Sequence, residues 1–435
     1  MAMKNGNSLW CFSNSTFFQY LTLSRKIAPH PNNEQLAMSK LLEYLSIDSV
    51  LPSPDYEKSF QFFKKYAQEL ELKIQKYEME TGKPIYVLKK KGTKTRAKAV
   101  MFFAPLDVAP TDEAEWTTAP NSPGRDTDGK IFARGTQRGK STTIQLLEAL
   151  RRFKVTGKAK FQRDLYLVFG SGTDDGAGSD SLYRFLDSNA FREFDIGYAI
   201  ADAEPSETDV YKVCHSERLS WELSIKIAGK VGHQSRFVER DCGRKLAAFL
   251  AKVYQFRDEQ EARLTATENG ARLGDVTTIS LTDAAGGTMT SLLPDQIQVF
   301  FNVRIPPNPS AFYKFEELVH QWCEAAGPGV TYEFTEKPQS ISTTSTAYDD
   351  AFWNAFSGAI TKEGAKYEIE VQPTPSGLQL LRDWNVPVLG FSAVANIENR
   401  IFAGDEYIPE REFFNGIDVY ERLIGAIANL STNAD

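Results

Sequence analysis

The sequence contains few of the side chains that bind transition metals. Among its 435 residues there are four histidines and four cysteines. The cysteines form no CxxC pair, which excludes a disulfide framework and a thiolate metal site and favours a reducing compartment; they are Cys11, Cys214, Cys242 and Cys323. No two histidines have the i, i+4 spacing that places two ligands on one helical face; they are His30, His215, His233 and His320.

A long apolar run and a strong excess of charge are also lacking. No stretch approaches the roughly 18 uninterrupted apolar residues that a bilayer-spanning helix requires. The 50 basic and 57 acidic side chains give a net charge of −7, which provides no global field to attract nucleic acid or anionic lipid. With 42% hydrophobic and 25% charged residues, the composition is that of a soluble globular protein, and the length predicts two or three domains.

The first 33 residues contain no Asp or Glu but carry Lys4, Arg25 and Lys26. Two interpretations are open for this segment: a mitochondrial presequence, or an uncleaved arm that packs on the body or on a partner. We favour the arm. We therefore predict a cytoplasmic protein, with the mitochondrion as the alternative.

Hydrophobic periodicity predicts an α/β domain that is interrupted by a differently patterned insertion. Before the insertion, helical spacing alternates with short buried runs; the helices are expected at 58–72 and 141–153, and the strands at 85–88, 99–104, 165–169 and 197–201. After the insertion, a strand at 386–391 and a helix at 413–427 continue the pattern. We expect residues 34–217 and 338–435 to form one central, mostly parallel sheet flanked by helices.

The insertion, residues 218–337, has a period of two. Trp221, Leu223, Ile225 and Ile227 alternate with polar residues, which is typical of a sheet with one solvated face. A second alternating strand at 297–305 and helices near 246–256 and 312–323 follow, the last of them closed by Gly327. This stretch predicts a separate α+β unit.

Acidic residues follow several of the predicted strands. Carboxylates gathered at strand ends suit acid–base chemistry or a hard cation, whereas Asp beside Gly in a loop also serves simply to end a strand; the residues concerned are Asp107, Asp174, Asp175, Asp202, Asp405 and Glu406. We place the last two in a loop after the final strand.

The segment 135–141 is not a phosphate loop, because three residues rather than four separate Gly135 from Gly139.

Nine ordered motifs carry a resemblance that spans about residues 35 to 430. They are Pro54-Asp55-Tyr56, Asp107-Val108-Ala109-Pro110, Ala133-Arg134-Gly135-Thr136-Gln137, Ser216-Glu217-Arg218, Gly232-His233-Gln234-Ser235-Arg236-Phe237, Gly286-Gly287, Trp322-Cys323-Glu324-Ala325-Ala326-Gly327, Val388-Leu389-Gly390-Phe391-Ser392 and Gly416-Ile417-Asp418-Val419-Tyr420. On these motifs the chain resembles the aminoacylase-1 family of co-catalytic zinc exopeptidases, which hydrolyse N-acyl amino acids. The resemblance implies a domain that holds two zinc ions and an inserted lid that forms a homodimer.

The resemblance also implies that most zinc ligands have been lost. A His, the bridging Asp, a further Asp and a second His of the family fall, in chain order, on Pro105, Arg138, Ala201 and Phe402. Zinc needs His, Cys or carboxylate donors, at least three for each ion. We therefore expect no bound metal, with the Arg138 guanidinium acting as a structural counter-ion beside the remaining carboxylates.

Remnants of the catalytic machinery remain. The family's adjacent base and ligand carboxylates fall on Asp174 and Asp175, or on Thr173 and Asp174 if no residue is inserted, and the Asp that supports the first His persists as Asp107. The lid histidine that reaches the neighbouring subunit's site matches His233, and the arginine that grips the substrate carboxylate matches Arg304.

Three functional hypotheses follow. The favoured one is a catalytically inactive member of the family, retained as a structural or assembly component, or as a subunit of a larger complex. The second is an active N-acyl-amino-acid hydrolase that has rebuilt its metal site from the remaining carboxylates. The third is a sensor that binds small carboxylates through Arg304 and His233 without turnover.

Overall fold

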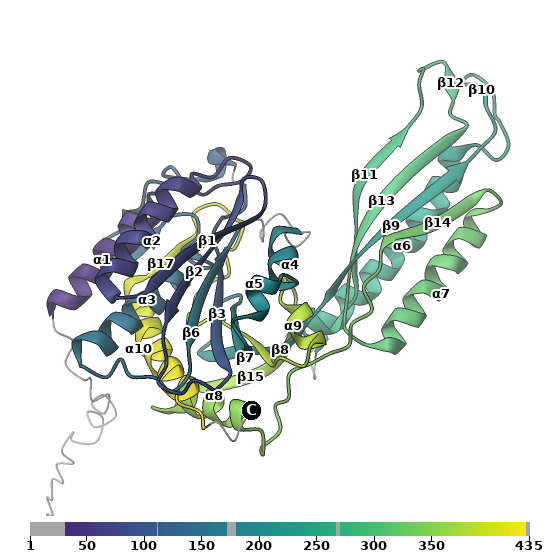
Figure 1. Cartoon of the computed structure of the whole chain (residues 1–435). Coiled ribbons are helices and arrows are strands. Elements are labelled where there is room, and N and C mark those ends of the chain that lie inside the picture. The colour runs from purple at the N-terminus through teal and green to yellow at the C-terminus, as the bar shows by residue number, and fades with distance from the viewer. Residues whose placement is uncertain (1–30, 111, 172–179, 267–269, 432–435) are drawn as a thin grey trace, which may run out of the picture.

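The computed structural model describes residues 31–110, 112–171, 180–266 and 270–431. It contains a body built on one large sheet and an elongated lid that projects from it (Figure 1). The body sheet has eight strands in the order β1-β2-β6-β3-β7-β16-β8-β15. In chain order these are β1 (Lys73–Glu80), β2 (Lys83–Lys90), β3 (Ala99–Pro105), β6 (Leu165–Gly170), β7 (Ile196–Asp202), β8 (Val210–Glu217), β15 (Lys366–Gln372) and β16 (Val388–Phe391).

The expected α/β class is confirmed, and the sheet is mixed. The parallel pairs are β3 with β6, β3 with β7, β7 with β16 and β8 with β15. The remaining pairs, β1 with β2, β2 with β6 and β8 with β16, are antiparallel. The sheet therefore reverses direction between β16 and β8, so the carboxyl ends of β7 and β16 lie at the same edge as the amino ends of β8 and β15.

Helices cover both faces of the body sheet. One core contains α1 (Pro31–Leu45), α2 (Tyr56–Leu70), α3 (Lys140–Val155), α8 (Ala351–Thr361) and α10 (Glu410–Ile427). The other core contains α4 (Asp180–Leu186), α5 (Asn189–Arg192) and α9 (Gln379–Asp383). Along β3, Val100 and Phe102 belong to the first core, while Met101 and Phe103 belong to the second. This alternation explains the unbroken apolar run, because a strand buried on both faces needs no polar position.

The lid is the unit formed by residues 219–336, and it has its own core. Its antiparallel sheet, in the order β11-β13-β9-β14, comprises β9 (Leu219–Ala228), β11 (Thr278–Gly286), β13 (Gln296–Ile305) and β14 (Val330–Glu336). Helices α6 (Cys242–Thr265) and α7 (Pro309–Ala326) cover one face of this sheet. The pair β10 (Gly232–His233) and β12 (Leu292–Leu293) lies at the far tip (Figure 1).

Local signals fix where several elements begin and end. The expected helix at 58–72 starts two residues earlier, because the Asp55 side chain accepts a hydrogen bond from the Lys58 amide as its N-cap. Gly327 ends α7 as expected: its N–H donates to Cys323 and Glu324 carbonyls at 3.3 and 3.1 Å, with φ +113°.

One expected position was wrong. The segment 402–406 does not follow the last strand, because β17 (Tyr407–Pro409) comes directly after it. This strand pairs with β5 (Lys130–Phe132), which in turn pairs with β4 (Gly124–Arg125) in a small separate sheet. Two 3-10 turns, η1 (Glu113–Glu115) and η2 (Leu273–Asp275), complete the described elements. No helix among the described residues is long and apolar enough to cross a bilayer.

Candidate functional site: the strand ends of the body sheet

The first two positions at which the resemblance implies a lost ligand, Pro105 and Arg138, lie together where β3 ends and α3 begins. Pro105 is the last residue of β3, and a Cβ placed on Gly139, the N-cap of α3, would lie 3.1 Å from the Pro105 carbonyl oxygen. Gly139 has φ +75°, a conformation that favours glycine. Arg138, which precedes it, is therefore carried to the same point of the fold as Pro105.

Asp202 joins this group from the end of β7. It accepts hydrogen bonds from the Gly139 amide at 2.8 Å and from the Thr142 hydroxyl at 2.6 Å, one on each carboxylate oxygen. The carboxylate thus satisfies the amino terminus of α3, where backbone N–H groups and the helix dipole favour a negative charge. The preceding residue, Ala201, is buried in the sheet and pairs with Gly390. The helix terminus therefore has an internal anion and is not a phosphate site.

Asp107 is fully buried just beyond β3 and is held by the first residue of α2. The Tyr56 hydroxyl donates to its Oδ2 at 2.7 Å. Burial, followed by the charge of Asp107, raises the pKa of Tyr56 well above its usual range, so this hydroxyl keeps its proton and remains a donor. The sequence placed Tyr56 in a motif, but it carried no sign of this contact.

Glu406 is the centre of a buried polar cluster that the sequence did not reveal. Its Oε2 lies 3.1 Å from Nη1 of Arg134, and its Oε1 accepts from the amides of Gly135 at 3.1 Å and Gln137 at 2.7 Å. Burial raises the pKa of Glu406, while these donors act in the opposite direction. Arg134 also donates to the Ala403 carbonyl and stacks on Trp116, with 5.1 Å from its guanidinium carbon to the ring centre.

Asp405 points to a different partner from Glu406. Its two carboxylate oxygens accept from the amide and the hydroxyl of Thr117 at 2.8 and 2.7 Å. The loop that carries Phe402 is thereby fastened to the loop after β3. Glycine is required at 404, because a Cβ there would collide with the Glu115 carbonyl oxygen. The two loops are therefore in close contact.

A small space at the strand ends has both Arg138 and Phe402 on its lining. Both line a space of about 10 Å³, together with Val108, Arg134 and Glu406. A cavity needs roughly 10–15 Å³ to hold a single water molecule. Arg138 is 6% exposed, so its cation lies inside the protein, while Phe402 is 46% exposed at the mouth, with φ +67°. Asp174 and Asp175, expected beside Arg138, lie outside the described residues.

The described residues at these positions do not fit a zinc pair. Pro105, Ala201 and Phe402 offer no donor side chain, and Arg138 offers a cation. The nearby carboxylates of Asp107, Asp202 and Glu406 are already bound by donors of the chain itself. In the part of the chain that the structure describes, no three His, Cys, Asp or Glu side chains converge as a metal site.

The structure places His233 and Arg304 at opposite ends of the lid. His233 is exposed in β10 at the tip, where its Nδ1 lies 2.8 Å from the Ser235 hydroxyl (Figure 1). Arg304 lies in β13, opposite Ser220, at the end of the lid that joins the body. Within one chain these two residues therefore do not form a common site.

Arg304 instead has Arg218 as its neighbour. Burial, and then the charge of Arg304, lower the pKa of Arg218 to about 10. Burial also lowers the pKa of Arg304. Arg218 donates to the carbonyls of Pro373 and Val276 at 3.0 and 3.2 Å, which fixes it between the body and the lid. Two partly desolvated cations thus lie at the junction.

Comparisons with known proteins agree with this architecture. Residues 101–426 match the model of Peptidase family M20/M25/M40. Aminoacylase-1 of Sus scrofa is 33% identical over 91% of this chain and 96% of its own, and aminoacylase-1 of Homo sapiens is 32% identical over 92% and 97%.

Solved structures share the fold. A metallo-carboxypeptidase of the M20 family from Sulfolobus solfataricus superposes with a TM-score of 0.69 at 14% identity, covering 90% of this chain and 99% of its own. Human carnosine dipeptidase 1 gives a TM-score of 0.66 at 16% identity, covering 91% and 97%. The chain therefore belongs to peptidase family M20/M25/M40 and is a homologue of aminoacylase-1.

Proposed function

We propose that this chain is a catalytically inactive aminoacylase-1 homologue that lacks the zinc pair and keeps a structural, assembly or carboxylate-binding role. The observation that carries the proposal is the chemistry at the strand ends. The four positions at which the resemblance implies lost zinc ligands hold Pro105, Arg138, Ala201 and Phe402, and the carboxylates around them are bound by internal donors.

Hydrolysis by the family's mechanism requires the metal. Bound zinc lowers the pKa of its water from 15.7 to about 7 and polarises the scissile carbonyl. A guanidinium cannot supply that nucleophile, and a cation at position 138 repels a divalent ion. The proposal therefore assigns Arg138 the part of a structural counter-ion.

Binding of a small carboxylate is the retained activity with a specific observation behind it. Arg218 and Arg304 lie close enough at the junction for the charge of Arg304 to lower the pKa of Arg218. The charges of Glu204 and Glu222 raise the pKa values of Arg218 and Arg304 and so already offset part of the repulsion. A bound carboxylate would offset more of it and matches the planar guanidinium in geometry. This supports binding without turnover, as the resemblance implies for Arg304.

The alternative is an active amidohydrolase with a rebuilt metal site, as the activity of its homologues would suggest. Its ligands would come from Asp107, Asp174, Asp175, Asp202, Asp405 and Glu406. The hydrogen bonds of Asp202, Asp405 and Glu406 weigh against it, because a metal would have to displace short contacts with backbone amides.

Metal analysis and an activity assay on one protein preparation distinguish the inactive protein from the active hydrolase. We expect purified protein to contain no stoichiometric metal by elemental analysis, and to leave N-acetyl-methionine intact with or without added Zn²⁺ or Mn²⁺. Aminoacylase-1 from pig, assayed in parallel, provides the positive control. Metal-dependent turnover above the no-enzyme rate would establish the rebuilt site and overturn the proposal.

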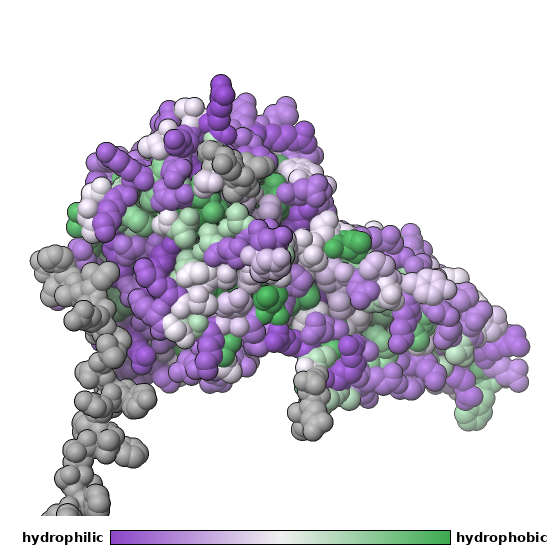
Figure 2. All heavy atoms as spheres, turned by 90° about the horizontal axis from the view of Figure 1, so that it is seen from below, coloured by the Kyte–Doolittle hydropathy of each residue, from purple (hydrophilic) through white to green (hydrophobic). Residues whose placement is uncertain are grey.

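Assembly through the lid completes the proposed function. Exposed apolar side chains flank the two tip strands; they are Val231, Phe237, Met289 and Leu292. Figure 2 shows hydrophobic side chains at this far end beside hydrophilic ones, and further hydrophobic side chains on the body. Strand β11 is an open edge of the lid sheet. A homodimer through the lid, in the cytoplasm, is the arrangement that we propose.

A further inference from the structure

Two segments at one edge of the body sheet are rich in positive charge. Residues 89–98 carry six Lys or Arg side chains and no acid, and residues 152–164 carry five with a single acid, Asp164. The whole chain has a net charge of −7, so these segments are a local exception. They lead into the parallel strands β3 and β6, and they therefore lie at the opposite edge from the strand-end site.

The pairing of the strands brings the two segments to the same edge. Lys73, the first residue of β1, pairs with Lys89, and Lys90, the last residue of β2, pairs with Leu165 at the start of β6. Val100 of β3 also pairs with Leu165. Four neighbouring strands therefore start or end here, and at about 4.8 Å between strands they span roughly 14 Å.

Backbone contacts hold the two segments together. The Lys94 amide donates to the Gln162 carbonyl at 2.8 Å, and the Gly92 amide donates to the Asp164 carboxylate at 2.7 Å. The approach requires glycine, because a Cβ on Gly92 would lie 2.3 Å from the carbonyl carbon of Arg163. Figure 1 shows the connections from β2 to β3 and from α3 to β6 at the lower end of the body. The charged side chains are thus carried on an ordered backbone.

Four of the cations already have partners inside the molecule. The side chains of Lys89, Arg152 and Lys154 form ion pairs, and Arg163 is fully buried and donates to backbone carbonyls. The carboxylates that pair with the first three are those of Asp164, Asp418, Glu421 and Glu71. These cations are therefore not available to a partner molecule.

Six further cations of the two segments form no ion pair within the part of the chain that the structure describes. All of them except Lys90 are exposed. We call this set the basic edge; it consists of Lys90, Lys91, Lys94, Arg96, Lys158 and Lys160.

Few acids lie close enough to neutralise the basic edge. Glu193 and Asp195 come just before β7 at one margin, where Lys98 also lies. Asp435 lies outside the described residues, beyond Ser431, whose carbonyl accepts a hydrogen bond from Arg163. Even when these three acids are all counted against Lys98 and the basic edge, positive charges remain in excess.

The side chains of the basic edge suit a broad negative surface better than a nucleic acid. Five of the six are lysines, which act as compact hydrated point charges, whereas arginine is the residue that recognises single phosphates and bases through paired donors. None of the exposed aromatic side chains of the described residues lies in these segments, so no base can stack there. Val155, at the end of α3, is 61% exposed beside them and offers apolar surface to a headgroup layer.

We propose that the basic edge binds the surface of a lipid bilayer that contains anionic lipids. Each Lys or Arg close to such a surface adds to the attraction, and salt screens it. In this orientation the strand-end site lies on the side of the body sheet that faces away from the bilayer. The inference goes beyond the proposed function, because neither zinc nor turnover enters it.

Sedimentation with large vesicles tests the proposal. We expect the full-length protein to sediment with vesicles of phosphatidylcholine and phosphatidylserine in about 50 mM salt, to stay in solution with phosphatidylcholine alone, and to be released in about 0.5 M salt. The variant that combines Lys91→Ala, Lys94→Ala and Lys160→Ala should lose at least tenfold in affinity. These side chains are exposed and have no partners among the described residues, so the variant should fold.

A matched control removes three exposed lysines from other places. Lys252→Ala and Lys314→Ala alter the lid, and Lys362→Ala alters the turn before β15, at the opposite edge of the body sheet. The net charge changes equally in both variants, so the control should keep the wild-type affinity. Unfolding temperatures within a few degrees of the wild type show that each variant is folded.

Several results would overturn the proposal. They are sedimentation that does not depend on phosphatidylserine, equal affinity in the wild type and the basic-edge variant, or an equal loss in the basic-edge and control variants. A short DNA duplex, titrated at the same salt, provides the comparison with nucleic acid, and tighter binding to it than to the vesicles would also refute the lipid surface. Metal content and hydrolysis enter none of these measurements, so their outcome is separate from the test of inactivity.

Discussion

Buried charges near the strand ends are bound by their own chain. Asp202 satisfies the start of α3, Asp107 accepts from Tyr56, and Glu406 binds Arg134 and two amides. At this scale the site is a set of paired, hydrogen-bonded charges, which is the form in which charges can remain buried. The consequences are measurable for single residues.

Arg134 should be far more important to stability than an exposed arginine nearby. Arg134 and Glu406 side chains are 4% and 3% exposed, so Arg134→Ala leaves a carboxylate buried without its cation. We expect the free energy of unfolding to fall by about 3–5 kcal/mol. Arg125, which pairs with Glu410 but is 54% exposed, is the matched control, with a loss below about 1 kcal/mol. Urea denaturation measures both, and equal losses would contradict the assigned role of the cluster.

Lys140 should make stability rise with pH in the mildly alkaline range. Its Nζ donates to the Ile47 carbonyl at 2.7 Å, and burial lowers its pKa to about 8. An unfolded lysine has a pKa near 10.4, so between pH 8 and 10 the unfolded state binds more protons. Burial of the protonated Lys140 therefore lowers the free energy of unfolding by its full amount below pH 8. This loss becomes smaller as the pH rises above 8.

The measurement is urea denaturation of the wild type and Lys140→Met at pH 7, 8, 9 and 9.5. We expect the wild type to gain up to about 1.4 kcal/mol per pH unit over the variant above pH 8. Tyrosine ionisation in the unfolded chain begins in the same pH range, but it affects both proteins alike and cancels in the difference between them. Parallel curves for the two proteins would refute the depressed pKa.

Elements meet closely where the lid joins the body. The turn η2 packs on β15, and a Cβ on Gly274 would collide with the Val371 carbonyl oxygen. Beside it, Arg272 lies 2.5 Å from Glu368 and also donates to the Ile369 carbonyl. The angle between lid and body is thus set by backbone contact as well as by charge.

Gly274→Ala and Gly358→Ala should therefore shift stability in opposite directions. The first forces η2 away from β15 and should cost about 1–3 kcal/mol. The second lies inside α8, where a Cβ meets nothing within 4 Å, and should stabilise by about 0.5–1 kcal/mol. Thermal unfolding tests both predictions, because the unfolding temperature should fall for Gly274→Ala and rise for Gly358→Ala. An unchanged unfolding temperature in Gly274→Ala would contradict the prediction, because it would mean that η2 and β15 can move apart at little cost.

At the scale of the whole molecule, the lid extends its sheet edge and apolar tip away from the body (Figure 1). The body sheet, in contrast, has charged edge residues such as Lys73 and Lys76 on β1, which discourage pairing of strands between molecules. Association is therefore expected at the lid and not at the body.

The proposed dimer can be tested by the mass of the protein in solution. We expect the wild type to elute at twice 48.8 kDa in size-exclusion chromatography with light scattering. Leu281→Glu, on the open edge strand β11, places like charges close together across a symmetric interface and should yield monomers. Thr331→Glu, on the other edge strand β14, is the control and should stay dimeric. A monomeric wild type would refute the lid dimer.

The sequence by itself determined the class of the fold and most of its elements. Unbroken apolar runs identified β3 and β6, the period of two identified β9 and β13, and Asp55 and Gly327 marked helix ends, because these signals depend on neighbours along the chain. The sequence also shows that the side chains of Pro105, Arg138, Ala201 and Phe402 cannot bind zinc, because this follows from the residue types alone.

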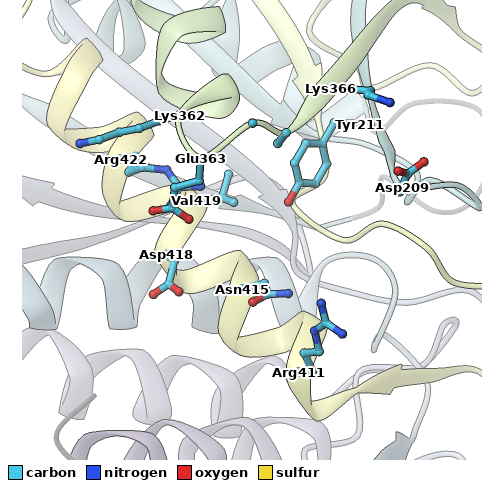
Figure 3. Close-up of a pocket in the computed structure, with 12 residues that line it drawn as sticks. Asp209, Tyr211, Lys362, Glu363, Lys366, Arg411, Asn415, Asp418, Val419 and Arg422 are labelled. Carbon is cyan, nitrogen blue, oxygen red and sulfur yellow. The ribbon is translucent and has the colours of Figure 1, made fainter. Parts of the chain in front are cut away.

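Only the tertiary structure decided what these residues contact. Arg134 and Glu406 are 272 positions apart, and a hollow on the body is lined by residues of β8, the turn after α8, β15 and α10, which come from three distant stretches (Figure 3). The sequence placed the loop at 402–406 after the last strand, because nothing local announces the three-residue β17 that pairs with β5. The packing of whole elements decides which buried polar residues contact each other, and the periodicity of the sequence carries no information about these contacts.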